Sequence, residues 1–188
     1  MTPYSDVANQ VIEIVSSYSG DREKWVVFDV DETLIHSHDE YIPDTFEYRG
    51  YYVLERPYLR DFIDLMVTDP FYRVGVWSAG TYDYVHAIVD HIFGIDHNLE
   101  FVMTRDDCFP IRRDGYIDYF KPLSILGEDD VVLVDNKPDV TTDPLNQILV
   151  KDFYYDEKDD ELLRLWHHLD TNRGMAPEWL CTNWSNGS

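Results

Sequence analysis

Short apolar runs alternate along this chain with segments in which apolar residues recur every three or four positions. The apolar runs are residues 25–30, 71–77, 100–103, 131–135 and 147–150. Their Val, Ile, Leu and aromatic content is typical of strands that are covered on both faces of a parallel sheet. The segments between them carry helical stripes, such as Val85, Ile88, Val89 and Ile92. This alternation predicts a doubly wound α/β domain, with a parallel sheet flanked by helices.

Polar side chains stand where several of these predicted strands end. They are Asp29, Asp31 and Thr33 after the first strand, Ser78 after the second, Lys121 before the fourth, and Asp135 with Asn136 at its end. Ligands of such sheets bind outside the carboxyl ends of the strands, near the point where the strand order reverses. A single Asp-x-Asp after a strand is commonly no more than a turn cap. The ordered set of residues, by contrast, predicts one catalytic site.

The set contains the groups that phosphoryl transfer requires, namely a nucleophile, a proton donor and groups that neutralise charge. Carboxylates act as covalent nucleophiles in phosphoryl transfer, so Asp29 is the candidate nucleophile. Asp31 is the candidate acid that protonates the leaving oxygen and then activates water. Thr33 is expected to hold Asp31 in place by hydrogen bonding.

The other members of the set would neutralise the charge of the phosphate. Asp29 and Asp135 can hold Mg²⁺, a hard ion that takes oxygen ligands and keeps several waters. Such an ion lowers the repulsion between a carboxylate and a phosphate. Lys121 and the Ser78 hydroxyl, together with the backbone amides of residues 30–32, would bind the remaining phosphate oxygens.

These motifs resemble those of the haloacid dehalogenase (HAD) superfamily. FDVDETL resembles its first motif, D-x-D-x-T, VWSAG its second, Lys121 in FKPLSILG its third and VLVDNKP its fourth. More narrowly, the chain resembles the FCP/SCP-like phosphatases, also called NLI-interacting-factor-like, which act on the C-terminal domain of RNA polymerase II. The stretches that carry this resemblance are DVDETLIHS, YYVLERP, RDDC (105–108) and DNKP. It covers roughly residues 24 to 170, and the combined motifs are highly specific.

The resemblance implies a HAD-like Rossmannoid sheet without a large cap, with a small β insertion after the first strand. It implies a Mg²⁺-dependent protein serine/threonine phosphatase that forms a phospho-aspartyl intermediate, with phosphoserine in peptides like the polymerase C-terminal domain as substrate. The implied roles are Asp29 as nucleophile and metal ligand, Asp31 as acid/base and backbone metal ligand, Ser78 and Lys121 on phosphate, and Asp135 with Asn136 at the metal. The stretch HDEYIPDTFEYRG and the approach to Lys121 depart from the usual pattern of the family.

The order of segments predicts how the chain is organised. Residues 1–22 are expected to form a helix, over 5–18, that packs on the core. A phosphatase domain is expected over 23–170, with a β-hairpin insert at about 39–56, Pro57 at the first position of the following helix, and a second hairpin over 108–120. The sequence does not decide whether the tail, 171–188, docks on this domain.

The composition limits the partners and the cell compartment that we expect for this protein. The chain has 37 acidic and 15 basic residues, a formal net charge of −22. Such a field repels polyanions, so direct nucleic-acid binding is not expected, although acidity also serves solubility alone. No apolar run approaches the length of a bilayer, and the first residues lack the pattern of a secretion signal. With only Cys108 and Cys181, a nuclear or cytoplasmic protein with reduced thiols and no membrane partner is expected.

Several other residues have both a functional and a structural interpretation. His36 and His38 suggest a metal pair, but nothing nearby completes a zinc site, so a structural or exposed role is favoured. Arg112 and Arg113 would hold a second phosphate or form an exposed hairpin tip, and the tip is favoured. Cys108 is expected to be a buried hydrophobic residue.

Aromatic and histidine residues outside the motifs are less decisive. A cluster of five rings would either line a groove for a proline-containing peptide or simply pack the insert; it consists of Tyr41, Phe46, Tyr48, Tyr51 and Tyr52. His167 and His168 are expected to be polar surface residues.

Three functions fit these observations. A protein serine/threonine phosphatase is favoured, because serines on a peptide need an open site and the chain is too short for a large cap. A phosphatase for nucleic-acid ends or a small phosphate ester is the second, although a small substrate usually needs a closing lid. The third is a phosphopeptide-binding module without turnover, which would have no need of Asp31. The oligomeric state and the physiological substrate stay open.

Overall fold

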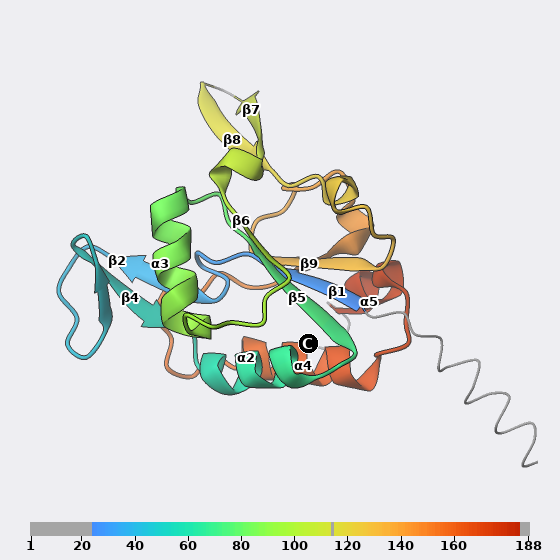
Figure 1. Ribbon diagram of the computed structural model, residues 1–188, viewed down its shortest axis with the longest axis horizontal. Coiled ribbons are helices and arrows are strands. Elements are labelled where there is room, and N and C mark those ends of the chain that lie inside the picture. Colours follow the sequence, from blue (N-terminus) through green and yellow to red (C-terminus); the bar gives the residue numbers. More distant parts are fainter. Residues whose placement is uncertain (1–23, 114, 185–188) are drawn as a thin grey trace, which may run out of the picture.

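The structure is a computed structural model that describes residues 24–113 and 115–184 (Figure 1). The helix predicted over 5–18, and with it the N-terminal region 1–22, lies outside the described residues. Within the described part, no helix has the length and apolar character needed to cross a bilayer.

A parallel sheet of five strands forms the centre of the domain. Its strands are β1 (Lys24–Phe28), β5 (Tyr72–Trp77), β6 (Phe101–Met103), β9 (Val131–Asp135) and β10 (Gln147–Leu149). They lie in the order β10-β9-β1-β5-β6, with parallel pairing throughout. The order therefore reverses at β1, which confirms the predicted α/β fold and places the switch point between β1 and β9.

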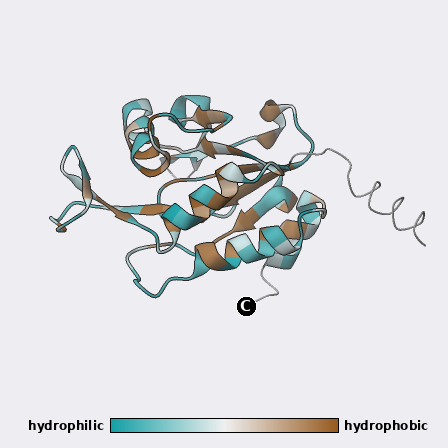
Figure 2. Ribbon diagram, turned by 60° about the horizontal axis from the view of Figure 1, so that its bottom comes forward, coloured by the Kyte–Doolittle hydropathy of each residue, from teal (hydrophilic) through white to brown (hydrophobic). Residues whose placement is uncertain are grey.

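Alternate side chains of β1 enter two different cores. Val26 and Phe28 pack in a large cluster together with four helices, and the Phe28 ring meets the edge of Phe62 at 5.4 Å. These helices are α2 (Leu59–Thr68), α3 (Tyr82–Phe93), α4 (Glu161–Thr171) and α5 (Pro177–Trp184). Figure 1 shows α2 and α4 side by side below the sheet, and Figure 2 shows the central strands as largely hydrophobic.

The opposite face of the sheet carries a smaller core. Val27, Trp77 and Leu133 are fully buried there. Leu123, from the single helical turn Leu123–Leu126, and Cys108 cover them. Cys108 is buried and accepts the indole N–H of Trp77 at 3.2 Å, so its predicted role as a buried hydrophobic residue holds.

Two antiparallel units project from the carboxyl edge of the sheet (Figure 1). The insert is a sheet of β2 (Ile35–His38), β3 (Phe46–Tyr48) and β4 (Tyr51–Glu55) in the order β2-β4-β3. Its hairpin turns at Arg49 (φ 51°) and Gly50 (φ 88°), two left-handed residues as in a type I′ turn. The second unit is the hairpin β7 (Phe109–Arg113) and β8 (Tyr116–Phe120). Both predicted hairpins are present, and β2 adds a strand that was not predicted.

The start of α2 differs from the prediction, and the structure answers the question of the tail, which the sequence left open. Pro57 does not open the helix: Tyr58 has φ 66°, so Pro57 and Tyr58 form a turn in which the Leu59 N–H reaches Arg56 O at 3.1 Å. The tail does dock. In α5 Leu180 is fully buried, and the Trp184 indole donates to Leu149 O of β10 at 3.0 Å.

Candidate active site

The carboxyl edge of the sheet opens into a cleft of about 890 Å³. Asp29, Asp31, Lys121 and Asp135 line it. Asp29 and Asp31 follow β1, Asp135 ends β9, and Lys121 follows β8. Asp29 and Lys121, which are more than 90 positions apart in the chain, thus meet at one edge of the sheet, where the sequence predicted a common site.

A single ammonium joins two buried carboxylates in the cleft floor. Lys121 Nζ donates to Asp29 Oδ1 at 2.6 Å and to Asp135 Oδ2 at 2.7 Å. Burial raises the pKa of Asp29 to about 7. The positive charge of Lys121 lowers this pKa only in part, and the negative charge of Asp135 raises it further. Burial lowers the pKa of Lys121, but its two carboxylates outweigh this and leave the pKa above its ordinary value. With both carboxylates ionised the group carries an uncompensated negative charge, which attracts a further cation.

Thr33 contacts Asp29, the candidate nucleophile, contrary to the role predicted for Thr33. Its fully buried hydroxyl lies 3.2 Å from both Asp29 Oδ2 and Asn136 Oδ1 and accepts the backbone N–H of Asn136 at 3.2 Å. The prediction that Thr33 holds Asp31 is therefore wrong. The chain turns sharply between the two residues, because Glu32 is left-handed (φ 59°), and Thr33 points inward while Asp31 faces the cleft.

Tyr84 on α3 holds Asp31 instead. Its hydroxyl donates to Asp31 Oδ1 and also lies 2.8 Å from Ser37 Oγ of β2. Burial raises the pKa of Asp31, and the hydrogen bond from Tyr84 and the charges of Lys137 and Lys121 counteract this only in part. A carboxyl group with a raised pKa suits a proton donor. The sequence held no signal that singled out this tyrosine among 14.

Ser78 lies at the end of β5, next to the tight turn that leads into α3. The side chain is buried, and its oxygen accepts the Gly80 N–H at 3.0 Å, whereas its hydroxyl proton can be donated to Asp31, whose pKa this hydrogen bond lowers. A Cβ on Gly80 would lie 2.8 Å from the Tyr84 ring. The turn therefore needs glycine, and its backbone can approach a phosphate closely.

Asn136 is oriented by a residue that sequence reasoning missed. Its amide Nδ2 donates to Asp152 Oδ1 at 2.7 Å, which turns the amide oxygen toward Thr33. Next to it, Asp135 Oδ1 accepts the Lys137 N–H at 2.8 Å. Asp152 follows β10, in a loop that no motif marks.

The donors at this edge suit Mg²⁺. In 24–113 and 115–184, no group of three or more His, Cys, Asp or Glu side chains is arranged to hold a metal ion. A metal here would therefore take two carboxylates, from Asp29 and Asp135, plus amide, backbone and water oxygens. That mixture fits an ion that demands oxygen ligands and keeps several waters, and the excess negative charge beside Lys121 favours it.

Arg56 fixes the loop that carries the two aspartates. Its guanidinium is fully buried and donates to the Thr33 carbonyl at 2.9 Å and, through two nitrogens, to Asp159 at 2.8 Å. The Phe153 N–H donates to the Glu32 carbonyl at 2.8 Å. The segment before α4 thus clamps the backbone on which Asp29 and Asp31 stand.

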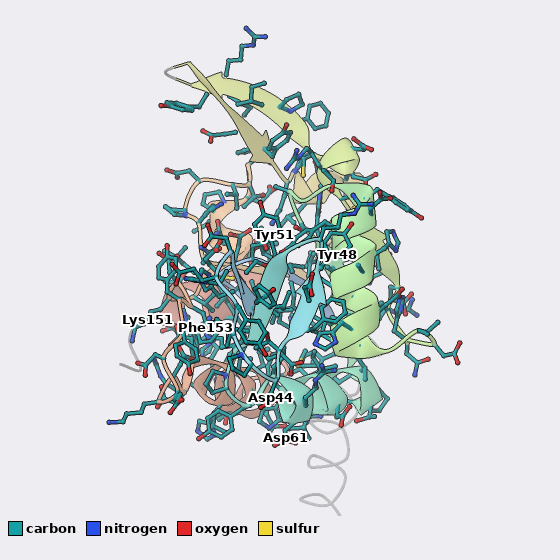
Figure 3. All side chains as sticks on the ribbon, turned by 90° about the vertical axis from the view of Figure 1, so that its left-hand side faces the viewer. Asp44, Tyr48, Tyr51, Asp61, Lys151 and Phe153 are labelled. Atoms are coloured by element: carbon teal, nitrogen blue, oxygen red, sulfur yellow. The ribbon has the colours of Figure 1, made fainter. Side chains whose placement is uncertain are left out.

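Some of the remaining candidate residues line the cleft and others do not. Of the five aromatic residues of the insert, Tyr48 and Tyr51 line the cleft, whereas Phe46 stacks on His91 at 4.2 Å. In Figure 3 Tyr48 and Tyr51 lie nearer than Phe153 to the β7–β8 hairpin. Arg112 is exposed and does not line the cleft, as expected for a hairpin tip; the side chain of Arg113 lies outside the described part.

The histidines take structural or surface positions. His36 Nδ1 lies 3.4 Å from Glu32, and His38 contacts the backbone of Glu40. His168, expected at the surface, is half-buried between α4 and α5, where its Nε2 lies 3.0 Å from Leu180 O. That expectation was wrong because docking of α5 covers the ring. His167 is exposed.

Comparisons with known proteins agree with this geometry. Residues 24–176 match the family model described as NLI interacting factor-like phosphatase. A CTD phosphatase-like protein of Invertebrate iridescent virus 3 is 27% identical over 187 residues, covering 80% of this chain and 97% of that protein. The CTD small phosphatase-like protein 2 of Dictyostelium discoideum is 31% identical over 158 residues, covering 78% of this chain but 27% of that protein.

A solved structure shows the same fold. It is a variant of the fission yeast RNA polymerase II CTD phosphatase Fcp1 bound to beryllium fluoride, with a TM-score of 0.55 and 20% identity. The match covers 79% of this chain and 45% of the Fcp1 chain. The match shows that this chain shares the α/β fold of that protein.

Proposed function

The chain belongs to the NLI interacting factor-like phosphatases, a family of phosphoprotein phosphatases, and on that premise we propose that it is a Mg²⁺-dependent serine/threonine phosphatase acting through a phospho-aspartyl intermediate. The observation that carries this proposal is the pairing of Asp29 and Asp135 on Lys121, with Asp31 held across the cleft by Tyr84. This arrangement supplies a nucleophile, a proton donor and a positive charge in one place.

The first half-reaction transfers the phosphoryl group to Asp29. A carboxylate oxygen of Asp29 bonds to phosphorus as the bond from phosphorus to the seryl oxygen breaks, and Asp31 gives its proton to that oxygen. Lys121 and the Ser78 hydroxyl bind the equatorial oxygens, where charge must be neutralised.

The second half-reaction returns the enzyme to its starting state. Asp31, now ionised, takes a proton from a water molecule, and the resulting hydroxide attacks the phosphorus. The bond between phosphorus and Asp29 breaks and inorganic phosphate leaves. Asp31 keeps the proton that it took from water, so it is again in its acid form. The raised pKa of Asp31 supports its role as proton donor, because burial favours the protonated carboxyl group.

Asp29, Asp135, Asn136 and the backbone carbonyl of Asp31 are the proposed metal-binding groups. Mg²⁺ bound there supplies positive charge between the carboxylate and the phosphate and lowers their repulsion. Thr33 supports this set through its contacts with Asp29 and Asn136.

The open cleft supports a peptide substrate. Two hairpins and the turn after β9 bound it, through residues such as Tyr48, Ile117 and Pro138, so a chain can cross the site. The name of the structural relative, an RNA polymerase II CTD phosphatase, supports a peptide substrate. We infer phosphoserine in peptides like the RNA polymerase II C-terminal domain as the substrate, and a nuclear or cytoplasmic protein. A small phosphate ester is the alternative substrate.

Phosphate release from a panel of substrates tests the proposal. The panel holds phosphoserine, phosphothreonine and phosphotyrosine peptides, polymerase-tail repeats, a 3′-phosphorylated oligonucleotide and a small aryl phosphate, each with Mg²⁺ or with EDTA. We expect release from seryl peptides that requires Mg²⁺ and disappears in Asp29→Asn.

Other outcomes separate the alternatives. Turnover of the aryl phosphate or the oligonucleotide without any peptide would keep the mechanism and refute the protein substrate. Peptide binding without turnover of any substrate would identify a phosphopeptide-binding module.

A further inference from the structure

The insert sheet has two faces with different surroundings, because side chains alternate along a strand. On one face Val53 is buried in the core and Ser37, its neighbour across the strands, contacts Tyr84 at 2.8 Å. On the other face His38 lies directly beside Tyr52. This second face turns away from the active site.

Five rings lie over this second face and the loop beside it, in two groups of ring contacts that the strand register brings side by side. Ring centroids are 5.3 Å apart for Tyr41 and Tyr52, 6.0 Å for His38 and His36, and 5.5 Å for His36 and Tyr154. The strand register joins the two parts by placing His38 opposite Tyr52. We name these five residues the aromatic ladder. Its end rings are exposed, Tyr41 by 72% and Tyr154 by 62%.

Carboxylates stand along the whole ladder. Three of them lie 3.9 Å from His38, 3.4 Å from His36 and 3.3 Å from the Tyr154 hydroxyl; in that order they are Asp39, Glu32 and Asp152. The exposed Glu47 of β3 lies beside Tyr52 in the register. Ring faces next to carboxylates are the surroundings that attract a Lys or Arg side chain.

The arginines of this chain place their guanidinium groups over other rings. In the described part of the chain, six arginines lie 4.9–5.9 Å from the centroids of aromatic rings, and none of those six rings belongs to the ladder. The ladder therefore pairs π faces with carboxylates without such an internal cation over its rings.

We propose that the aromatic ladder binds a basic segment of a partner protein. Lys and Arg side chains of the segment lie over the ring faces, and their charges are neutralised by the neighbouring carboxylates. The formal net charge of −22 steers such a segment to the surface. Guanidinium groups suit this site best, because they stack on aromatic planes and also pair with carboxylates.

The ladder is separate from the catalytic cleft. Ser37, Tyr48 and Tyr51 line the cleft from the insert, and no ladder residue does so. Glu32 borders both, since it lines the cleft and contacts His36. Binding at the ladder needs no turnover, so its test stands apart from the proposed phosphatase activity.

Fluorescence anisotropy of a labelled, unphosphorylated peptide that alternates Arg and Lys with Gly and Ser measures this binding on the full chain. A matched peptide with Gln in place of Arg and Lys is expected not to bind. Combined Tyr41→Leu and Tyr154→Leu substitutions keep an apolar surface but remove two ring faces. They should weaken binding about four- to twenty-five-fold, because each exposed cation–π contact changes affinity about two- to fivefold.

Matched controls distinguish the ladder from general attraction by the acidic surface. Tyr116→Leu removes a tyrosine that is 77% exposed on the other hairpin and should leave binding unchanged. Glu47→Gln, which conserves shape, should weaken binding, and Glu128→Gln should not. Equal loss in ladder and control variants, unchanged binding in the ladder variants, loss of binding in the cleft variant Asp118→Asn, or no binding at all would overturn the proposal.

Discussion

Outside the sequence motifs, the hydroxyl of Tyr84 is the side-chain group that donates a hydrogen bond to the proposed acid. In Tyr84→Phe the ring still packs against the turn at Gly80, but Asp31 loses its hydrogen bond. We expect kcat to fall about ten- to a hundredfold with little change in KM, because hydrogen bonds to charged groups contribute about 1.5–3 kcal/mol. Steady-state kinetics on a phosphoseryl peptide measure this.

Tyr82→Phe is the matched control, since Tyr82 lies on the same helix and is 61% exposed. It should retain the kcat of the unaltered chain. If Tyr84→Phe folds normally and turns over at the same rate, Tyr84 does not position the acid.

Thr33 joins three partners through one buried hydroxyl. Thr33→Val keeps the shape but leaves the buried backbone N–H of Asn136 without an acceptor. We expect the free energy of unfolding to fall by about 1–3 kcal/mol, and kcat to fall because Asp29 and Asn136 lose a shared contact. Urea unfolding and kinetics measure the two effects. Thr33→Ser should restore most of both, and a Ser variant as weak as the Val variant would show that packing of the methyl group matters instead.

At the scale of elements, the ion pair between Arg56 and Asp159 connects the segment before α4 to the first motif loop, because Arg56 also donates to the Thr33 carbonyl of that loop. Burial alone would raise the pKa of Asp159, but hydrogen bonds from Arg56 and from the Glu161 N–H outweigh it, so the pKa lies below its ordinary value. A carboxyl group with a lowered pKa stabilises the fold above its unfolded pKa of about 3.9, and this stabilisation is lost as pH falls through the folded value.

Asp159→Asn should therefore flatten the acid side of the stability profile. It should also destabilise the chain at neutral pH by about 3 kcal/mol, because it leaves the buried Arg56 charge without its partner. Urea unfolding from pH 7 down to pH 3 measures both effects. Asp160→Asn, at an exposed neighbouring position, should behave as the unaltered chain. Parallel profiles for Asp159→Asn and the unaltered chain would refute this account.

The helices and strands also show which structural features can be predicted from sequence patterns and which cannot. The buried faces of α2 and α3 follow from the spacing of residues such as Phe62 and Ile88, because a helix repeats every 3.6 residues. The β3–β4 hairpin follows from Arg49-Gly50. The start of α2 does not, because Tyr58 adopts a left-handed conformation that local preference disfavours, and only the surrounding structure can hold it there.

At the scale of the whole molecule, the same distinction applies to the site. Asp29 and Asp135 could be placed together from the sequence, because parallel strands end at one edge, and the resemblance to the third motif added Lys121, which follows the antiparallel strand β8. Tyr84, Asp152 and the partners of Thr33 could not. They reach the site from a helix or from loops whose position depends on packing far along the chain, as in the contact between Asn136 and Asp152.

The charge balance of the cleft floor links stability to function across the whole domain. Without metal, Lys121 is shared between two buried carboxylates, and the excess negative charge opposes folding. Asp29→Asn removes that excess while its amide oxygen can still accept from Lys121. We therefore expect Asp29→Asn to unfold in EDTA about 2–8 °C above the unaltered chain, if it gains about 1–2 kcal/mol.

Mg²⁺ should reverse this order. Binding to the folded state raises the unfolding temperature of the unaltered chain with metal concentration, whereas Asp29→Asn, lacking one anionic ligand, should respond weakly. Scanning calorimetry with EDTA and with increasing Mg²⁺ measures both, and Asp118→Asn in the cleft wall controls for general loss of charge. Equal Mg²⁺ responses in both proteins would show that Asp29 does not hold the metal. A lower unfolding temperature of Asp29→Asn in EDTA would show that the ion pair between Asp29 and Lys121 stabilises the fold by more than the excess negative charge destabilises it.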